Sequence, residues 1–177
     1  MIFIKTKFEG VYVIEPEKIE DERGFFARVW DKDEFSKMRL DSKIVQSSIS
    51  INKKKGTIRG MHYQSKPHEE NKIVRCTRGK IFDVLIDLRP NSKTFKKWFS
   101  IELTENNYKM MYIPKGFAHG FQTLKDNTEI SYDIFEFYYP KSSRGIRWDD
   151  DEFRIRWPLK VSKISQKDAT YTSFSDK

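Results

Sequence analysis

Three histidines, His62, His68 and His119, are the side chains of this sequence best suited to exchange a proton near neutral pH. Two of them lie in short segments that are otherwise glycine-rich and apolar: residues 59–64 read RGMHYQ, and residues 114–121 read PKGFAHGF. A histidine in such a setting can serve as a general base, or as a metal ligand if other ligands lie nearby. The alternative is a buried, hydrogen-bonded histidine with a structural role only.

The segment around His62 reads as a β-strand, in which successive side chains point to opposite faces. In that conformation Gly60, His62 and Gln64 share one face, and Met61 and Tyr63 share the other. An arginine, a histidine and a glutamine gathered beside glycine are unusual in an apolar core. The pattern therefore favours a pocket on one side of this strand.

Short apolar or alternating segments recur along the chain and predict the strands that position these histidines. They cover residues 10–15, 44–51, 72–76, 80–88, 98–103, 109–113, 116–124 and 129–137. Many short strands without interleaved helices predict an all-β sandwich or barrel rather than a parallel α/β sheet. Two short helices are expected, one at residues 31–40 and one near residues 165–169.

Length and composition limit the possible functions of the chain. Its 177 residues suit one domain, residues 1–177, with a core drawn from its 14 Phe and 8 Tyr. The net charge of +8 is scattered, so a small anionic substrate fits better than a nucleic acid. No segment has the apolar length of a membrane helix, and the start lacks a secretory signal. The single cysteine, Cys76, cannot form an internal disulfide, which favours the cytoplasm.

The two histidine segments together resemble the paired motifs of the cupin superfamily, which implies a jelly-roll barrel with a few short helices. The motifs are carried by Gly56, His62, Gln64 and Glu69, and by Pro114, Gly116 and His119. Metal-binding cupins have a histidine where this chain has Gln64, and a neutral amide is a poor ligand for a transition metal. A metal site would have to use His62, His119 and either Glu69 or Glu70, and we expect none.

A longer series of segments is similar to the dTDP-4-dehydrorhamnose 3,5-epimerase family, a metal-free branch of the cupins. The matching segments follow one another through nearly the whole chain. They are residues 21–26 (DERGFF), 59–64 (RGMHYQ), 72–76 (KIVRC), 81–89 (IFDVLIDLR), 113–121 (IPKGFAHGF), 145–150 (GIRWDD), 155–158 (IRWP) and 165–169 (SQKDA). The resemblance implies a homodimeric isomerase that inverts C3, C5 or both in a nucleoside-diphosphate 4-keto sugar, with no cofactor.

The resemblance also implies roles for individual residues. His62 matches the family's base and Asp168 its carboxylate partner, while Tyr132 matches the proton donor and Lys72 the cation beside the developing enolate. Other positions match residues that bind the substrate, some of them across a dimer interface: Arg23, Phe26, Gln46, Arg59, Asp83, His119 and Tyr138. Without the resemblance, Asp168 would be interpreted as a helix cap, Tyr132 as a core tyrosine and Lys72 as a surface charge.

These residue types suit the removal of a hydrogen from carbon next to a ketone, which needs a base and a group that stabilises the enolate. Histidine titrates in the right range, and a carboxylate beside it fixes its tautomer and stabilises the imidazolium. A lysine supplies positive charge where the enolate oxygen gains negative charge. A tyrosine hydroxyl can return a proton to the opposite face, which completes an inversion.

Two positions depart from the family pattern on the nucleotide side. Arg28 stands where the family has a glutamate, and Ser48 where it usually has an asparagine. Arginine only donates hydrogen bonds, so the first exchange reverses the local charge and hydrogen-bond polarity. The family that the chain resembles also includes enzymes that act on GDP-linked 4-keto-heptoses in capsule or surface-glycan pathways. The resemblance therefore implies such a sugar as a candidate substrate beside a dTDP-linked one. The competing functions are a metal-dependent cupin isomerase or oxygenase, and a non-catalytic sugar-binding cupin.

Overall fold

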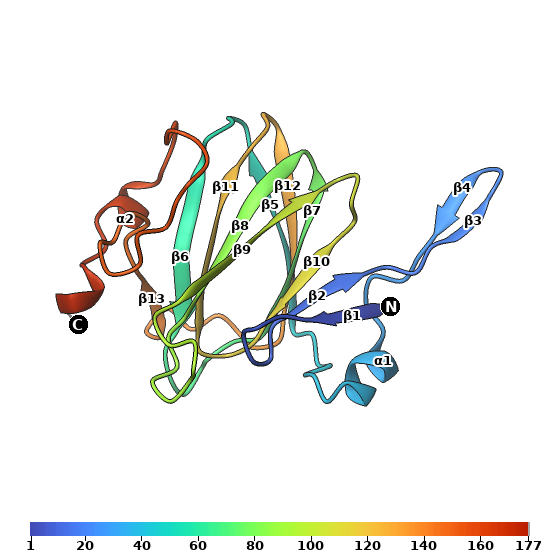
Figure 1. Cartoon of the computed structure of the whole chain (residues 1–177), viewed down its shortest axis with the longest axis horizontal. Helices are drawn as coiled ribbons and strands as arrows, with labels where there is room; N and C mark the ends of the chain where they lie inside the picture. The colour runs from blue at the N-terminus through green and yellow to red at the C-terminus, as the bar shows by residue number, and fades with distance from the viewer. Residues whose placement is uncertain (177) are drawn as a thin grey trace.

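The computed structural model of the protein describes residues 1–176, which form two antiparallel sheets and a separate hairpin (Figure 1). The six-stranded sheet has the order β1-β2-β10-β7-β12-β5, the five-stranded sheet the order β13-β6-β11-β8-β9, and β3 pairs with β4. The strands are β1 (Ile2–Lys5), β2 (Tyr12–Glu15), β3 (Ile19–Asp21), β4 (Gly24–Phe26), β5 (Gln46–Asn52), β6 (Ile58–Gln64), β7 (Lys72–Arg78), β8 (Lys80–Asp87), β9 (Trp98–Thr104), β10 (Met110–Ile113), β11 (Phe117–Thr123), β12 (Thr128–Ile134) and β13 (Ser143–Gly145). The helices are α1 (Lys32–Lys37), α2 (Gln166–Ala169) and the 3-10 turn η1 (Phe174–Asp176).

The two sheets pack face to face around an apolar core. The six-stranded sheet contributes Val74, Met111 and Ile130, and the five-stranded sheet contributes Leu85, Leu103 and Phe121, all fully buried. Alternate residues of each strand point into this layer, as expected for facing antiparallel sheets. The predicted all-β barrel with a few short helices is confirmed, and each of the eight predicted strands overlaps an observed one.

Helix α1 covers part of the outer face of the six-stranded sheet. The Asp31 carboxylate caps it by accepting hydrogen bonds from the backbone N–H groups of Asp33 and Glu34. The helix is shorter than the predicted 31–40, because the chain turns at Arg39, which has a positive φ of 56°. Its one fully buried side chain, Phe35, packs in a second cluster with Ile14, Ile73, Met110, Tyr112 and Phe135.

The C-terminal segment covers the outer face of the five-stranded sheet. Phe153 and Ile146 join a third cluster with Met61, Val84 and Ile86, which belong to the strands beneath. A short parallel bridge pairs Thr57 with Lys163, and it leads the chain into α2 beside β6 (Figure 1). This packing is what carries residues near the C-terminus to the segment around His62.

The β3–β4 hairpin projects away from the barrel on the side opposite to α2 (Figure 1). All its residues are exposed, including the large apolar side chains of Ile19 and Phe26, which are 70% and 66% exposed. The pattern of the sequence did not predict these strands, because neither face of the hairpin alternates between buried and polar positions. In residues 1–176 we find no helix with the length and apolar character needed to span a bilayer.

Candidate active site

A polar cavity of about 300 Å³ lies between the two sheets and contains most of the predicted site residues. Strands β5, β7 and β12 form one wall, and strands β6 and β11 form the other. The predicted residues that line it are Gln46, Arg59, His62, Lys72, His119, Tyr132 and Tyr138. Segments that are far apart in the sequence therefore meet in one place, as the functional interpretation requires.

The predicted alternation of side chains in β6 is confirmed for the residues around His62. Met61 and Tyr63 pack in the outer cluster, whereas His62 faces the cavity. Arg59 also lines the cavity although strict alternation would place it with Met61, and the reason is a register shift between β6 and β11 at this point. Gly60 permits the close approach: it has φ +126°, and an added Cβ would lie 2.5 Å from Gly120 Cα.

The His62 imidazole forms a hydrogen bond with a buried carboxylate. Its Nε2 lies 2.7 Å from Oδ1 of Asp168, which is 4% exposed. The second oxygen of Asp168 accepts a hydrogen bond from the Gly60 backbone N–H at 3.2 Å. Burial alone would raise the pKa of the Asp168 carboxyl, but the hydrogen bond and charge of His62 and the Gly60 N–H outweigh it, so the pKa is lowered. Asp168 therefore remains an anion that orients the imidazole.

The alternative role of Asp168 as a helix cap does not describe this structure. Ser165 is the N-cap of α2, and its hydroxyl accepts a hydrogen bond from the Asp168 backbone N–H at 3.0 Å. The Asp168 side chain is thereby left to bind His62. The ring of Tyr171 packs edge-on against His62, with centroids 6.1 Å apart. The C-terminal segment thus supplies both the carboxylate and a wall for the imidazole.

Tyr132 reaches the cavity from the sheet opposite to His62. Its ring packs edge-on against His119, with centroids 6.3 Å apart. Burial raises the pKa of the Tyr132 hydroxyl far above its ordinary value, and the negative field of Asp83 adds to this effect. The hydroxyl therefore keeps its proton in the free protein, and the nearby Arg59 charge opposes part of the upward shift.

His119 forms a second histidine–carboxylate pair beside the first. Its Nε2 lies 2.7 Å from Oδ1 of Asp83, a side chain with no exposed surface. Burial raises the pKa of Asp83, although His119 and Lys72 oppose the shift. Because β6 and β11 place His62 and His119 directly opposite each other, both imidazoles belong to the same wall of the cavity. The buried carboxylate of Asp83 thus has its partner on the neighbouring strand of the same sheet.

Lys72 begins β7 and is almost completely buried in the wall of the cavity. Its ammonium group forms an ion pair with the carboxylate of Glu70. The interpretation of Lys72 as a surface charge is therefore wrong, since only 8% of its side chain is exposed. Arg59 is held in place by a hydrogen bond from its Nε to Asn52 Oδ1 at 2.7 Å. Both cations are available to negative groups of a ligand.

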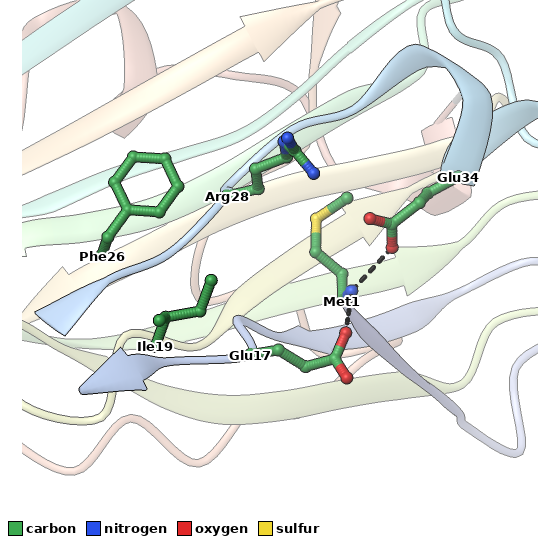
Figure 2. A pocket seen from close by; sticks show the side chains of 6 residues that line it. All are labelled: Met1, Glu17, Ile19, Phe26, Arg28 and Glu34. Carbon is green, nitrogen blue, oxygen red and sulfur yellow. Dashed lines mark hydrogen bonds and ion pairs between the residues drawn. The ribbon is translucent and has the colours of Figure 1, made fainter.

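Three predicted substrate-binding residues do not line this cavity. Asp83 has no exposed surface and reaches the cavity only through His119. The other two belong to the hairpin and its turn. Arg23 is exposed and pairs with Asp21, and Phe26 stands on the projecting hairpin. Phe26 instead borders a separate cavity of about 320 Å³ near the N-terminus. Figure 2 shows this cavity, where the Met1 ammonium group binds the carboxylates of Glu17 and Glu34 below Arg28. A single chain therefore does not bring the hairpin residues to His62.

The pattern of the sequence missed several side chains at the site. The sequence indicates Glu70 only as a possible metal ligand, although the residue lies in the cavity wall. Lys167 and Tyr171 border the same histidine from the C-terminal segment. Their position next to Asp168 is the one signal that could have indicated them.

The predicted residue Tyr138 is fixed by a hydrogen bond from its backbone N–H to the Gln46 side chain at 2.9 Å.

Among the side chains that the structure describes, those of residues 1–175, no three His, Cys, Asp or Glu are grouped to hold a metal ion. Gln64, at the position where metal-binding cupins have a histidine, uses its amide for loop contacts. Its nitrogen donates to the carbonyls of His68 and Phe137, and its oxygen accepts from the Tyr139 N–H. This side chain has a structural role in the present arrangement.

Two facing antiparallel sheets that enclose a polar, histidine-bearing cavity define a cupin-like β fold. Comparison with known sequences then narrows the class. The sequence model of the dTDP-4-dehydrorhamnose 3,5-epimerase family matches residues 5–176. The chain belongs to this family and is accordingly an enzyme of the isomerase class, a sugar-nucleotide epimerase.

Individual relatives resemble the chain over nearly its full length. A dTDP-4-dehydrorhamnose 3,5-epimerase of Sinorhizobium fredii is 40% identical over 99% of this chain and 91% of its own. The crystal structure of such an epimerase from Elizabethkingia anophelis matches with a TM-score of 0.96 and 36% identity, covering 100% of this chain and 98% of its own. The Legionella pneumophila dTDP-6-deoxy-D-glucose-3,5-epimerase in complex with dTDP-4-keto-L-rhamnose matches with a TM-score of 0.91 and 34% identity, covering 98% of this chain and 93% of its own.

Proposed function

We propose that this protein inverts C3 and C5 of a nucleoside-diphosphate 4-keto sugar by proton transfer between its own side chains and the substrate. The observation that carries the proposal is the placement of His62, paired with Asp168, and Tyr132 on opposite walls of one cavity. A base and an acid that approach a carbon from opposite sides are the minimum requirement for inversion. The family membership supports the same reaction.

In the proposed mechanism His62 removes the hydrogen next to the carbonyl. Asp168 holds Nε2 of the imidazole, so Nδ1 is the nitrogen that takes the proton from carbon. The carboxylate stabilises the imidazolium that forms, because opposite charges in contact attract strongly in a partly buried site. General base catalysis of this kind contributes about 10²- to 10⁴-fold to a rate.

Lys72 stabilises the enolate oxygen that forms as the hydrogen leaves. Its ammonium group lies in the cavity wall and is partly shielded from water, so its interaction with a developing oxyanion is stronger than in bulk solvent. The His119–Asp83 pair adds a second fixed polar group from the opposite sheet. These groups are already in position, which reduces the reorganisation needed in the transition state.

Tyr132 then delivers a proton to the face opposite His62. Its hydroxyl retains its proton in the free enzyme because burial raises its pKa. The transfer leaves a tyrosinate for which the cations Arg59 and Lys72 of the same cavity provide compensation. One base and one acid can serve C3 and C5 in turn if the sugar ring is repositioned between the two steps.

We propose a dTDP-linked sugar as the substrate, since the relatives are named for it. A guanine nucleotide is the second candidate because of Arg28 and Ser48. Ser48 lines the cavity, and Arg28 borders the pocket near the hairpin. An arginine can donate two hydrogen bonds to the O6 and N7 acceptors of guanine, a pairing that thymine does not offer.

We further propose a homodimer in which the hairpin of one chain completes the cavity of the other. Ile19 and Phe26 expose large apolar surfaces on an arm that packs little against its own barrel. Arg23 and Phe26 lie away from His62 within one chain, so only a partner could bring them there. Light scattering should give twice the chain mass of 21.2 kDa, and Phe26→Ser should shift the protein toward the monomer. A wild-type monomer at micromolar concentration would contradict this arrangement.

Incubation with dTDP- and GDP-linked 4-keto sugars in deuterium oxide tests the reaction and the nucleotide together. We expect deuterium at C3 and C5 of the preferred sugar, and a loss of at least about 100-fold in exchange for His62→Asn. Exchange at one carbon would restrict the reaction to a single inversion. His68→Asn is the matched control, because His68 stacks on Tyr139 outside the cavity. Normal exchange by His62→Asn would refute the assignment of the base.

A further inference from the structure

The ion pair between Glu70 and Lys72 is the feature of the cavity that the mechanism leaves unexplained. Lys72 has a role as a cation, whereas a carboxylate beside it weakens its positive field. Both partners are mostly buried, with 14% of the Glu70 side chain and 8% of the Lys72 side chain exposed. A pair at the surface would contribute little, but a carboxylate withdrawn from water needs partners for both of its oxygens.

The backbone around Glu70 is fixed, so the carboxylate is a permanent part of the wall. The neighbouring Asn71 donates a side-chain hydrogen bond to Asp41 at 3.1 Å and accepts one from the Lys115 backbone N–H at 2.9 Å. Its carbonyl accepts a third from the Phe135 N–H at 3.0 Å. Because these contacts anchor the residue between Glu70 and Lys72, the pair keeps its place when a ligand enters.

One oxygen of Glu70 remains available to a ligand. Oε1 accepts the hydrogen bond from Lys72, and Oε2 forms no hydrogen bond with any group that the structure describes. Glu70 also borders a second, smaller cavity that is lined by His62 and Tyr138. Glu70 therefore shares cavity walls with the proposed base and is in contact with the lysine that meets the carbonyl.

We propose that Glu70 determines which sugars the cavity accepts, by taking a hydrogen bond from the substrate hydroxyl on the carbon next to the carbonyl. An ammonium and a carboxylate side by side present a donor and an acceptor. An α-hydroxy ketone presents the complementary set, a carbonyl acceptor and a hydroxyl donor on neighbouring carbons. The inference rests on the proposed function, in which Lys72 meets the carbonyl oxygen.

The chemistry of the sugar identifies the hydroxyl. In a 4-keto pyranose the carbonyl carbon has two ring neighbours, C3 and C5. C5 carries the ring oxygen and C6, so the hydroxyl next to the carbonyl is the one on C3. The Glu70 carboxylate accepts a hydrogen bond from the C3 hydroxyl and repels an anionic substituent at that carbon. The preferred substrates therefore have a free C3 hydroxyl.

The test compares two sugar nucleotides, a 4-keto sugar with its C3 hydroxyl and the 3-deoxy analogue, on wild type and Glu70→Gln. Deuterium exchange at C5 is read for both, because C5 keeps the same substituents. We expect Glu70→Gln to lower kcat/KM for the hydroxylated sugar roughly 10- to 100-fold, as for loss of a charged hydrogen-bond acceptor. The 3-deoxy analogue should be affected less than about 3-fold, because it never made the contact. Glu69→Gln removes the same charge one residue away and is expected to leave both substrates unchanged.

Each result supports or overturns the inference. An equal loss on the two substrates would mean that Glu70 acts only through Lys72 or through folding, and would overturn it. No loss on either would also overturn it. If the wild-type protein exchanges no deuterium with either sugar while it remains folded, the proposed function fails first and the inference with it.

Discussion

Replacement of Asp168 by asparagine is the sharpest test of the proposed base. The substitution keeps the size of the side chain and a hydrogen-bonding group beside His62 but removes the negative charge. In the structure the imidazole and carboxylate are joined at 2.7 Å, and Asp168 is only 4% exposed. Opposite charges centred about 4 Å apart attract by about 4 kcal/mol at an effective dielectric constant of 20. That loss in the transition state corresponds to a decrease of about 10³-fold in kcat.

The assay is C3 and C5 deuterium exchange at saturating substrate, with nucleotide binding measured separately by calorimetry. We expect kcat to fall and the affinity for the bare nucleoside diphosphate to stay within about 2-fold, since Asp168 faces the imidazole and not the nucleotide. Asp151→Asn, an exposed change in the same C-terminal segment, is the control for the loss of one charge. If Asp168→Asn retains exchange within 10-fold of wild type, the carboxylate does not stabilise an imidazolium and the mechanism is wrong.

Three further predictions follow from single contacts. Tyr132→Phe should keep deuterium exchange by His62 but form the inverted sugar about 100-fold more slowly, as NMR of the products would show. Burial would raise the pKa of the Asp87 carboxyl, but hydrogen bonds, above all from Arg89, lower this pKa to about 2. The ionised carboxylate therefore stabilises the folded protein above pH 4, and this stabilisation is lost as the pH falls toward 2. Asp87→Asn should cost about 2–3 kcal/mol in urea unfolding at pH 7 and almost nothing near pH 2. Gly60→Ala should lower the melting temperature and the activity together, because its Cβ would collide with Gly120.

Much of the barrel is encoded in local patterns. Four segments have either alternating apolar and polar residues or a continuous apolar run, bounded by turn residues. They form β7, β8, β11 and β12, which are interior strands of the two sheets. The local pattern does not predict the hairpin β3–β4, and the reason is physical. Its apolar residues are exposed in the single chain, so no buried face marks it as a strand.

The site was predictable as a set of residue types but not as a geometry. His62 and His119 stand out in their segments, and strand alternation places His62 on the correct face. The contact of His62 with Asp168 depends on how the C-terminal segment crosses the outer face of the sheet, which no local pattern encodes. Arg59 and Glu70 show the same limit, since a register shift and an anchored loop decide where they point.

The docked C-terminal segment has a consequence for how this enzyme fails. His62 and Asp168 are 106 positions apart in the sequence. Asp168 belongs to the C-terminal segment, which is held on the outside of the barrel mainly by apolar contacts such as those of Phe153 and Ile146. If mild heat, urea or a protease detaches the C-terminal segment, His62 loses its carboxylate partner. Both sheets would stay folded, so the far-UV circular dichroism spectrum would change little. Enzymatic turnover then measures whether the C-terminal segment is docked, whereas circular dichroism measures whether the barrel is folded. A preparation can therefore have the spectrum of the folded protein and no activity.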